Sequence, residues 1–282
     1  MVVTKVAVVT GGNKGIGYEI VKGLCEKFNG IVYLTARDVN RGKAAVEQLN
    51  KESLKPEFHQ LDIKNKNSID IFAKFLKEKH GGIDVLVNNA AIAFKHDATE
   101  PFAVQADETI ATNYFALLDV CHALFPLLRP NSRVVNLSSS CGCLSQIPGK
   151  EIRDKFLISD MTEEKLNGLM KEFVEAAKKG DSKKLGWGGS AYVVSKVGVT
   201  ALTFIQHRNF VLDPRENIII NAVHPGYVDT DMTSHKGPLT PQQGAEAPLY
   251  CALLSTDTKT PQGELVWKDK KVVDWENPPS GF

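Results

Sequence analysis

The chain has 282 residues, a formal net charge of +1 and 43% hydrophobic residues. A net charge so close to zero argues against a general nucleic-acid-binding or membrane-surface protein, and no apolar run approaches the roughly 20 residues of a membrane span. The five cysteines show no disulfide-like pattern and the N-terminus shows no cleavage-site pattern, so we expect a cytoplasmic protein. We expect no metal site, because no histidine or cysteine cluster has ligand spacing.

Short apolar, β-branched runs alternate along the chain with longer segments of helical periodicity. The expected strands are Val6–Val9, Ile31–Leu34, Val85–Val87, Arg133–Leu137 and Ile218–Ala222, and the expected helices include Gly17–Phe28, Val39–Glu52, Ser68–Lys79 and Ala106–Leu128. This alternation predicts an α/β fold, a doubly wound (Rossmann-type) parallel sheet with helices on both faces. We see no linker and expect one domain over residues 1–282.

The first strand leads directly into a glycine-rich turn, TGGNKGIG, and then into a helix. Glycines let the backbone approach a pyrophosphate, and the first N–H groups of the helix point at it. The spacing G-x-x-x-G-x-G is a variant of the usual dinucleotide motif, and a tight strand–helix turn without a ligand is the alternative. We expect the cofactor contacts Gly11, Asn13, Lys14, Gly15, Ile16 and Gly17.

The end of the second strand indicates which dinucleotide is bound. Ala36 stands where an acidic residue would hold the ribose of NAD, and Arg37 follows it. Lys14 and Arg41 add positive charge, and guanidinium groups match phosphate oxygens well. The pattern favours NADP(H), although Asp38 lies one step beyond the expected carboxylate position.

Residues 142–189 interrupt the alternation and contain one clear helix. Thr162 can cap it, two glutamates suit its N-terminal end, and Lys178–Gly180 ends it. One apolar stripe follows helical spacing, namely Leu166, Leu169, Met170, Phe173, Val174 and Ala177. We expect this stripe to pack against its own domain; a partner-protein surface is the alternative.

Tyr192 and Lys196 are four residues apart in a segment that reads as a helix. Side chains at this spacing share one helical face, so the ammonium group can approach the phenol. A nearby positive charge lowers a phenol pKa, and we therefore expect Tyr192 to be a proton donor or acceptor activated in this way. Most isolated matches of this kind are solvated helix faces.

Together these motifs resemble the short-chain dehydrogenase/reductases, and more closely the monomeric carbonyl reductases. The resemblance runs essentially end to end and rests on Thr10–Gly17, Leu34–Asp38, Leu61–Ile63, Asn88–Ala90, Thr112–Asn113, Asn136–Ser139, Tyr192–Lys196 and His224–Met232. It implies an NADP(H)-dependent reduction of aldehydes and ketones by Asn113, Ser139, Tyr192 and Lys196.

The resemblance also implies a role for each of these four residues. Tyr192 would give its proton to the carbonyl oxygen while Ser139 hydrogen-bonds that oxygen. Lys196 would hold the nicotinamide ribose, and Asn113 would orient a water that relays protons. Ser139 could instead only form a turn, and Asn113 could be an ordinary satisfied amide.

The remaining site expectations concern loops. Further cofactor contacts are expected at Asp62, Ile63, Asn89, Val228 and Thr230, besides Arg37, Arg41, Tyr192 and Lys196. The substrate is expected to meet Ser139, Tyr192, Tyr227, Met232 and the 142–146 loop. His224 is the histidine expected nearest the active site, and a role without substrate contact is the more common one for such a residue.

Two departures from the family pattern stand out. Ala91 replaces the family's glycine near the cofactor, and Ser139 and Tyr192 are 53 positions apart, a far longer separation than is usual. The excess resembles the insertion of the monomeric carbonyl reductases, which covers the face other members use to dimerise, and so implies a monomer.

Three functions remain open beside a broad carbonyl and quinone reductase. They are a narrow-substrate dehydrogenase of steroid or prostaglandin type, a non-catalytic NADPH-sensing regulator, and a scaffold that uses the apolar stripe of residues 166–177. If the protein is an enzyme, its expected partner is a small-molecule carbonyl substrate.

Overall fold

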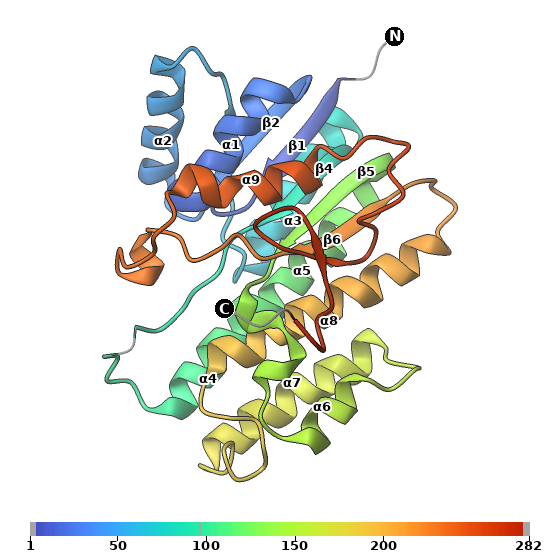
Figure 1. The fold of residues 1–282 in the computed structure, drawn as a ribbon. Helices are drawn as coiled ribbons and strands as arrows, with labels where there is room; N and C mark the ends of the chain where they lie inside the picture. Colours follow the sequence, from blue (N-terminus) through green and yellow to red (C-terminus); the bar gives the residue numbers. More distant parts are fainter. Residues whose placement is uncertain (1–3, 96, 279–282) are drawn as a thin grey trace.

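Eight strands form one sheet at the centre of the molecule (Figure 1). The computed structural model describes residues 4–95 and 97–278. The strands are β1 (Lys5–Val9), β2 (Gly30–Ala36), β3 (Glu57–Gln60), β4 (Ile83–Asn88), β5 (Leu128–Leu137), β6 (Ile219–Val223), β7 (Leu265–Val266) and β8 (Val272–Val273). Their order is β3-β2-β1-β4-β5-β6-β7-β8, and all neighbours are parallel except β7 and β8.

This order places the point where the chain reverses its direction across the sheet between β1 and β4. Val9 pairs with Leu34 of β2 on one side and with Val87 of β4 on the other. In open α/β sheets ligands bind beyond the carboxyl ends of the strands at such a point. The predicted fold class is confirmed, and the glycine-rich turn lies at the expected place.

The helices cover both faces of the sheet. They are α1 (Gly15–Lys27), α2 (Val39–Lys51), α3 (Lys66–His80), α4 (Phe102–Ile110), α5 (Ala116–Leu124), α6 (Lys150–Phe156), α7 (Glu163–Lys178), α8 (Ala191–Val211) and α9 (Pro241–Ala252). Short 3₁₀ turns span Phe125–Leu127, Ser140–Gly142, Leu144–Gln146 and Asp231–Thr233.

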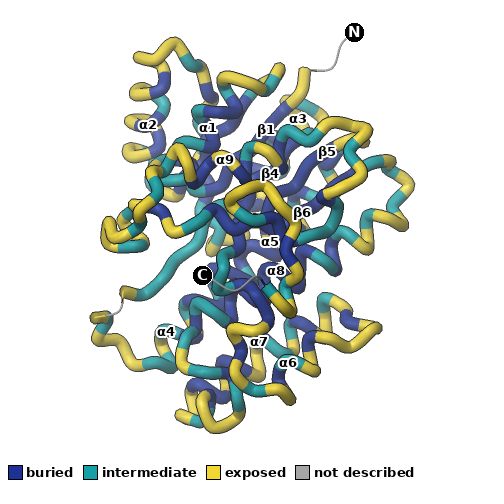
Figure 2. Tube along the Cα trace, in the orientation of Figure 1, coloured by how far each residue is buried: buried dark blue, intermediate teal, exposed yellow. Residues whose placement is uncertain are grey.

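Alternate residues of each strand enter different layers of the core, because successive side chains of a strand point to opposite faces. Ala7 and Val9 of β1 pack in the layer formed with α1, α2 and α9. Val6 and Val8 pack in the layer formed with α3 and α5. The strands are therefore buried from both sides (Figure 2), which is why they read as continuous apolar runs in the sequence.

The helix expected over residues 106–128 is longer and less regular than predicted. It runs through α4, a π-helical turn (Ala111–Phe115), α5 and a 3₁₀ turn. The continuous stretch Phe102–Leu127 is long and apolar enough to cross a membrane by length and composition, which corrects the expectation that no stretch would be. More than half of the apolar 18-residue window within this stretch is buried inside the fold, as in a core helix.

The insertion of residues 142–189 contains α6 and α7 and lies at one end of the molecule, below α8 in Figure 1. The Thr162 hydroxyl accepts the N–H of Lys165, as the capping prediction requires. Leu166, Met170 and Phe173 are fully buried in a cluster with α4 and α8. The apolar stripe therefore packs against its own chain, and its use as an exposed scaffold is contradicted.

The sequence analysis missed β3, the short β7 and β8, and helices α6 and α9. Residues of β3, EFHQ, have no apolar run, because this edge strand is only partly covered. Helix α9 begins with Pro241 behind a capping box of Thr240 and Gln243, a signal that was available but not used.

Buried amides connect the centre of the sheet to α8. Asn88 Nδ2 donates to Asn136 Oδ1 at 2.8 Å, which joins β4 to β5. Asn136 Nδ2 donates in turn to Thr203 Oγ1 at 2.9 Å and Gln206 Oε1 at 3.0 Å on α8. Because these bonds are directional, they fix how α8 lies along the sheet.

Candidate active site

The glycine-rich turn forms one wall of the candidate site. Gly11 and Gly15 have φ angles of +65° and +54°, a region that residues with a Cβ rarely adopt. At Gly17 a Cβ would lie 2.4 Å from Asn89 Nδ2, so only glycine allows this approach. Among the described residues no side chain caps the start of α1, because Lys14 makes no capping bond there. The first N–H groups of α1 are thus available to an anion, and the turn fits a pyrophosphate.

Asn89 is hydrogen-bonded to the backbone of the glycine-rich turn. Its Nδ2 donates to the carbonyl oxygens of Thr10 at 2.9 Å and Gly11 at 3.1 Å. The Thr10 hydroxyl accepts the N–H groups of Asn89 and Ala90, each at 3.0 Å. These bonds join the ends of β1 and β4 on either side of the chain reversal.

A cavity of about 270 Å³ lies beside the ends of β2 and β3. It is lined by Arg37, His59, Gln60, Asp62, Asn65, Asn67, Ser68 and Ile71. Arg37 is exposed there, and its carbonyl accepts from Gln60 Nε2 at 3.0 Å. Arg37 and Asp62 were predicted from the sequence, whereas His59, Gln60, Asn65, Asn67, Ser68 and Ile71 were not. The cavity lies at the edge of the sheet that β2 and β3 form, whereas Tyr192 lies on α8 and meets the sheet at the end of β5.

The three predicted cations have different surroundings. Arg41 forms an ion pair with Asp38 at 3.1 Å. Lys14 pairs with Asp231 at 2.6 Å, with both side chains 61% exposed. Among these three, Arg37 lines the cavity, and the phosphate contacts of all three stay predictions.

The segment after β6 lies against the glycine-rich turn. A Cβ at Gly15 would be 3.3 Å from Thr230 Cγ2, and Gly244 is close to both Ile16 and Val228. Val228 is buried. Ile63, also a predicted contact, is partly buried against the core layer that includes α3 and α5. Tyr227 and Met232, the predicted substrate residues, are largely exposed on this segment.

Ser139 and Tyr192 meet at the carboxyl end of β5. Ser139 caps the 3₁₀ turn Ser140–Gly142, and its hydroxyl lies close enough to the Tyr192 phenol to lower the pKa of that phenol. Ser190 caps α8 by accepting the N–H of Val193, which places Tyr192 in the first turn of this helix.

Lys196 is directed at the backbone rather than at the phenol oxygen. Its side chain is only 3% exposed, and Nζ donates to Leu137 O at 2.5 Å. The same Nζ lies 5.6 Å from the centroid of the Tyr192 ring. Burial lowers the pKa of Lys196 to about 8.

The expected fall in the Tyr192 pKa is wrong for this structure. Burial, and then the neighbouring Cys141 thiol, raise the pKa of Tyr192 above its usual value, and the Ser139 hydrogen bond offsets this only in part. The reason is that desolvation disfavours the phenolate. A phenol that stays protonated at neutral pH remains suited to donating a proton.

Asn113 lies in the π-helical turn, a local irregularity that is frequent at functional sites. Its Oδ1 accepts the N–H of Ile92 at 2.8 Å, and its Nδ2 donates to Ile92 O at 2.9 Å. Nδ2 also lies 3.1 Å from the Ser195 hydroxyl, which itself donates to Tyr192 O. Ser195, which the sequence analysis did not select, thus connects Asn113 to the helix that carries Tyr192.

No three histidine, cysteine, aspartate or glutamate side chains gather as metal ligands within residues 4–95 and 97–278. The expectation of no metal stays a prediction, and His96 lies outside the described residues. All five cysteines are free.

The sheet carries a glycine-rich turn where the chain reverses between β1 and β4, and Ser139, Tyr192 and Lys196 lie at the end of β5. These features define a dinucleotide-dependent oxidoreductase. A family model described as short chain dehydrogenase matches residues 5–150. The chain belongs to the short-chain dehydrogenase family.

Individual relatives extend the match over nearly the whole chain. Carbonyl reductase (NADPH) 1 of Sus scrofa is 49% identical over 99% of this chain and 97% of its own length. Carbonyl reductase (NADPH) 1 of Homo sapiens is 50% identical, covering 96% and 98%. Among solved structures, salutaridine reductase of Papaver somniferum has a TM-score of 0.83 at 31% identity, covering 93% of this chain and 99% of that one.

Proposed function

We propose that this protein reduces aldehydes, ketones and quinones to alcohols with NADPH. The observation that carries the proposal is that the Ser139 hydroxyl and the Tyr192 phenol lie together, beside the buried Lys196. The names of two relatives at about half identity, both NADPH carbonyl reductases, support the same activity and cofactor.

The residues present fit the cofactor. The uncapped start of α1 and the glycines of its turn suit the pyrophosphate, and Arg37 at the 270 Å³ cavity suits the 2′-phosphate. NADPH supplies a hydride when bound, which no side chain can do.

Each catalytic side chain then has one task. The Tyr192 phenol, which is protonated at neutral pH, donates its proton to the carbonyl oxygen. The Ser139 hydroxyl donates a hydrogen bond to the same oxygen and stabilises the charge that develops on it. The Lys196 ammonium would hold the nicotinamide ribose, and Asn113 would orient a water that relays protons to Lys196.

The contacts retained in the proposal are those expected from the sequence, with two adjustments. Arg37 is the principal phosphate-binding cation, because Arg41 and Lys14 already have carboxylate partners. Asn89 acts through the glycine-rich turn that it holds. Tyr227 and Met232 line the substrate entrance, for which their exposure on the loop after β6 is suitable.

NADPH oxidation followed by absorbance tests the function, with a quinone and an aliphatic aldehyde as substrates and NADH in parallel. Turnover with NADPH well above NADH is expected. Tyr192→Phe should lose turnover and still bind NADPH. Tight NADPH binding without turnover on a wide carbonyl panel would instead favour the narrow-substrate enzyme or the sensor.

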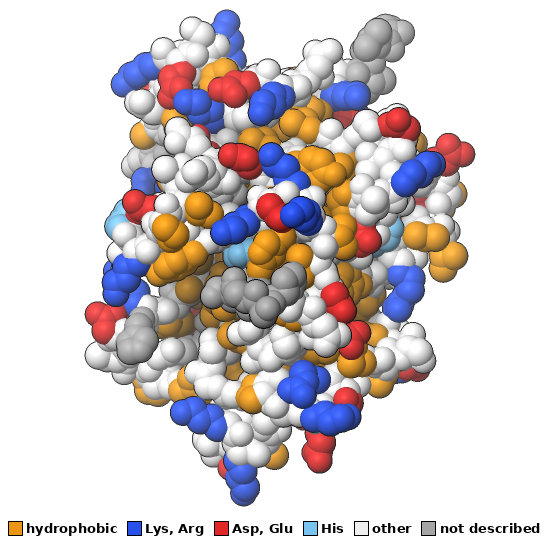
Figure 3. Space-filling view, viewed as in Figure 1, with side chains coloured by type: hydrophobic (Ala, Val, Ile, Leu, Met, Phe, Trp, Pro, Cys, Tyr) orange, Lys and Arg blue, Asp and Glu red, His pale blue; other side chains and the backbone are white. Residues whose placement is uncertain are grey.

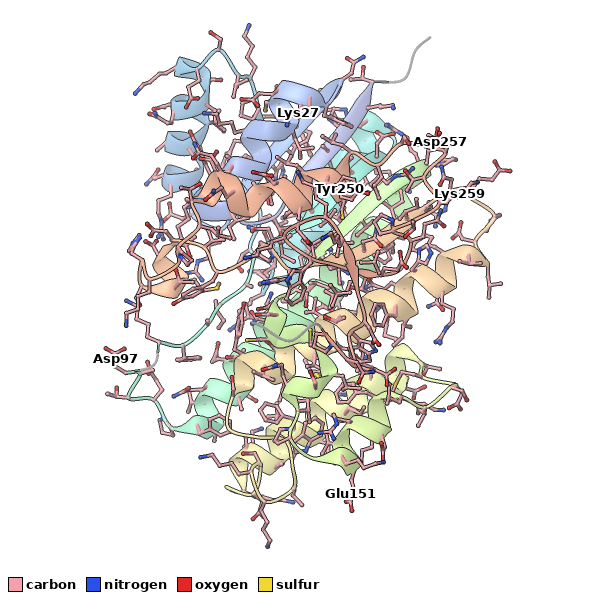
Figure 4. The ribbon with its side chains drawn as sticks, in the orientation of Figure 1. Lys27, Asp97, Glu151, Tyr250, Asp257 and Lys259 are labelled. Atoms are coloured by element: carbon pink, nitrogen blue, oxygen red, sulfur yellow. The ribbon has the colours of Figure 1, made fainter. Side chains whose placement is uncertain are left out.

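The proposal includes a cytoplasmic monomer built as one domain. Free cysteines suit a reducing compartment. The insertion covers α4 and α8 with an apolar face and turns charged side chains outward, as Glu151 of α6 shows (Figure 4). Both signs of charge are interspersed on the face in Figure 3. Light scattering on the purified protein should give the mass of one chain.

A further inference from the structure

His224 is a buried histidine directly after β6 that the mechanism above does not use. Its side chain is only 7% exposed. Its backbone N–H donates to Val266 O at 2.8 Å, which fixes the main chain to β7. Its ring packs on Trp267, with ring centroids 4.2 Å apart. The histidine is thus held in one position.

The imidazole reaches across from β6 to the turn that follows β5. Its Nδ1 accepts the N–H of Ser140 at 2.9 Å and, over a longer distance of 3.4 Å, the N–H of Gly226. Ser140 is the residue after Ser139 and the first residue of the 3₁₀ turn. One nitrogen atom therefore connects the turn that carries the serine to the turn at Gly226.

Accepting these bonds requires a lone pair on Nδ1, and so a neutral ring with its proton on Nε2. Burial, followed by the charge of Lys268, lowers the pKa of His224 to about 4. The ring therefore remains an acceptor across the neutral range.

We propose that His224 is a positioning residue for Ser139. The other hydrogen bonds that shape the 3₁₀ turn are internal: Gly142 N–H donates to Ser139 O at 2.9 Å, and Cys141 N–H donates to Ser139 Oγ at 3.2 Å. On the other side of Ser139, the N–H of Ser138 donates to Val223 O of β6 at 2.8 Å. The bond from Ser140 to His224 ties the residue after Ser139 to the end of the same strand, and so fixes the turn on its second side and holds the Ser139 hydroxyl beside Tyr192.

The proposal rests on the role given to Ser139, and its test compares two amides of different length. In His224→Asn the carbonyl oxygen can replace Nδ1 as the acceptor, whereas in His224→Gln the polar group reaches the position of Nε2. We expect His224→Asn to keep kcat within about threefold of the unchanged protein. We expect His224→Gln and His224→Leu to lose kcat by about tenfold, the factor that one neutral hydrogen bond is worth, with the NADPH Kd unchanged.

His207 provides a matched control. It is partly buried on α8, and its Nδ1 accepts the N–H of Ile220 of β6 at 3.5 Å. It lies fifteen residues beyond Tyr192 on α8, roughly 22 Å along the helix axis. His207→Leu should lower the melting temperature and leave kcat unchanged.

Several outcomes would overturn the proposal. Equal losses of kcat in His224→Asn and His224→Gln would do so, as would an unchanged kcat in His224→Leu. Weakened NADPH binding that accounts for the loss would assign the residue to the Gly226 turn instead. Failure of both the Gln and Leu variants to fold would mean that the histidine maintains the fold rather than the serine.

Ser139→Ala separates this proposal from the proposed function. If Ser139→Ala retains full turnover, the role of Ser139 is wrong and the enzyme works by another arrangement. If Ser139→Ala is inactive while His224→Gln and His224→Leu are normal, only the positioning role fails.

Discussion

Replacing Phe173 by alanine should destabilise the protein by a large and measurable amount. Phe173 lies on α7 with no exposed surface, in the cluster that joins the insertion to α4 and α8. Its ring contacts Trp187 and Phe102 at centroid distances of 5.6 Å and 6.3 Å. Truncating a buried phenylalanine removes this packing and leaves a cavity, at a cost of about 3–5 kcal/mol.

That cost is a large part of the stability of a typical domain, about 5–15 kcal/mol. At about 2–4 °C per kcal/mol for a chain of this size, the melting temperature should fall by roughly 6–20 °C. Differential scanning calorimetry and urea unfolding would measure it. Well below the transition kcat should be unchanged, because the rings that Phe173 contacts, Trp187 and Phe102, are not candidate catalytic residues.

Glu172→Ala is the control on the same helix. Glu172 is exposed and pairs with Lys155 at the surface, and such pairs are worth about 0–1 kcal/mol. A loss below about 1 kcal/mol in Phe173→Ala would refute the reasoning, since this is far less than a buried ring costs. It would mean that the insertion contributes little to the fold.

Three further predictions address the cofactor, the proton chemistry and a helix. Arg37→Ser should raise the KM for NADPH by about tenfold or more, the scale of a charged hydrogen bond, and leave the KM for NADH unchanged. Arg41→Ser should raise the KM for NADPH much less. Equal effects of the two substitutions would contradict the assignment of Arg37 as the principal phosphate-binding cation. Because the pKa of Lys196 is lowered to about 8, its ammonium is present below that pH, so kcat for reduction should fall as pH rises through it; a flat profile to pH 10 would count against this role. Gly168→Ala should stabilise α7 by about 0.5–1 kcal/mol, since a Cβ there meets nothing within 4 Å. Gly23→Ala on α1 should destabilise the protein, because a Cβ there would lie 2.3 Å from a leucine side chain of α9. Calorimetry should show melting temperatures that change in opposite directions.

The sheet could be predicted because its strands are buried on both faces. β1, β2 and β5 contain short runs of consecutive apolar residues, which are typical of strands covered on both faces of a parallel sheet. β3 could not be found this way, since its residues are partly exposed and its pairing with β2 depends on a neighbour distant in sequence. Of the residues that line the cavity beside β2 and β3, the sequence pointed to Arg37 and Asp62 but not to His59 and Gln60, which lie on β3 itself.

At the site, the sequence indicated which residues meet but not how they are solvated. The spacing of Tyr192 and Lys196 correctly placed them on one helix. Their pKa values depend on burial by the rest of the chain, and burial outweighs the attraction that spacing alone suggests. The hydrogen bond from Ser140 to His224 joins segments 84 residues apart, which no local pattern could reveal.

The amides that join β4 and β5 to α8 have a consequence for how reliably the site assembles. If α8 docked one turn out of register, Tyr192 would move by about 5.4 Å and the buried Asn136 would lose its partners Thr203 and Gln206. Each orphaned polar group would cost about 1–3 kcal/mol. An interface made only of apolar side chains would tolerate such a shift at a lower cost, because apolar contacts are not directional. Misaligned, inactive conformers are therefore rare in the folded population, and nearly every folded molecule should be competent for turnover.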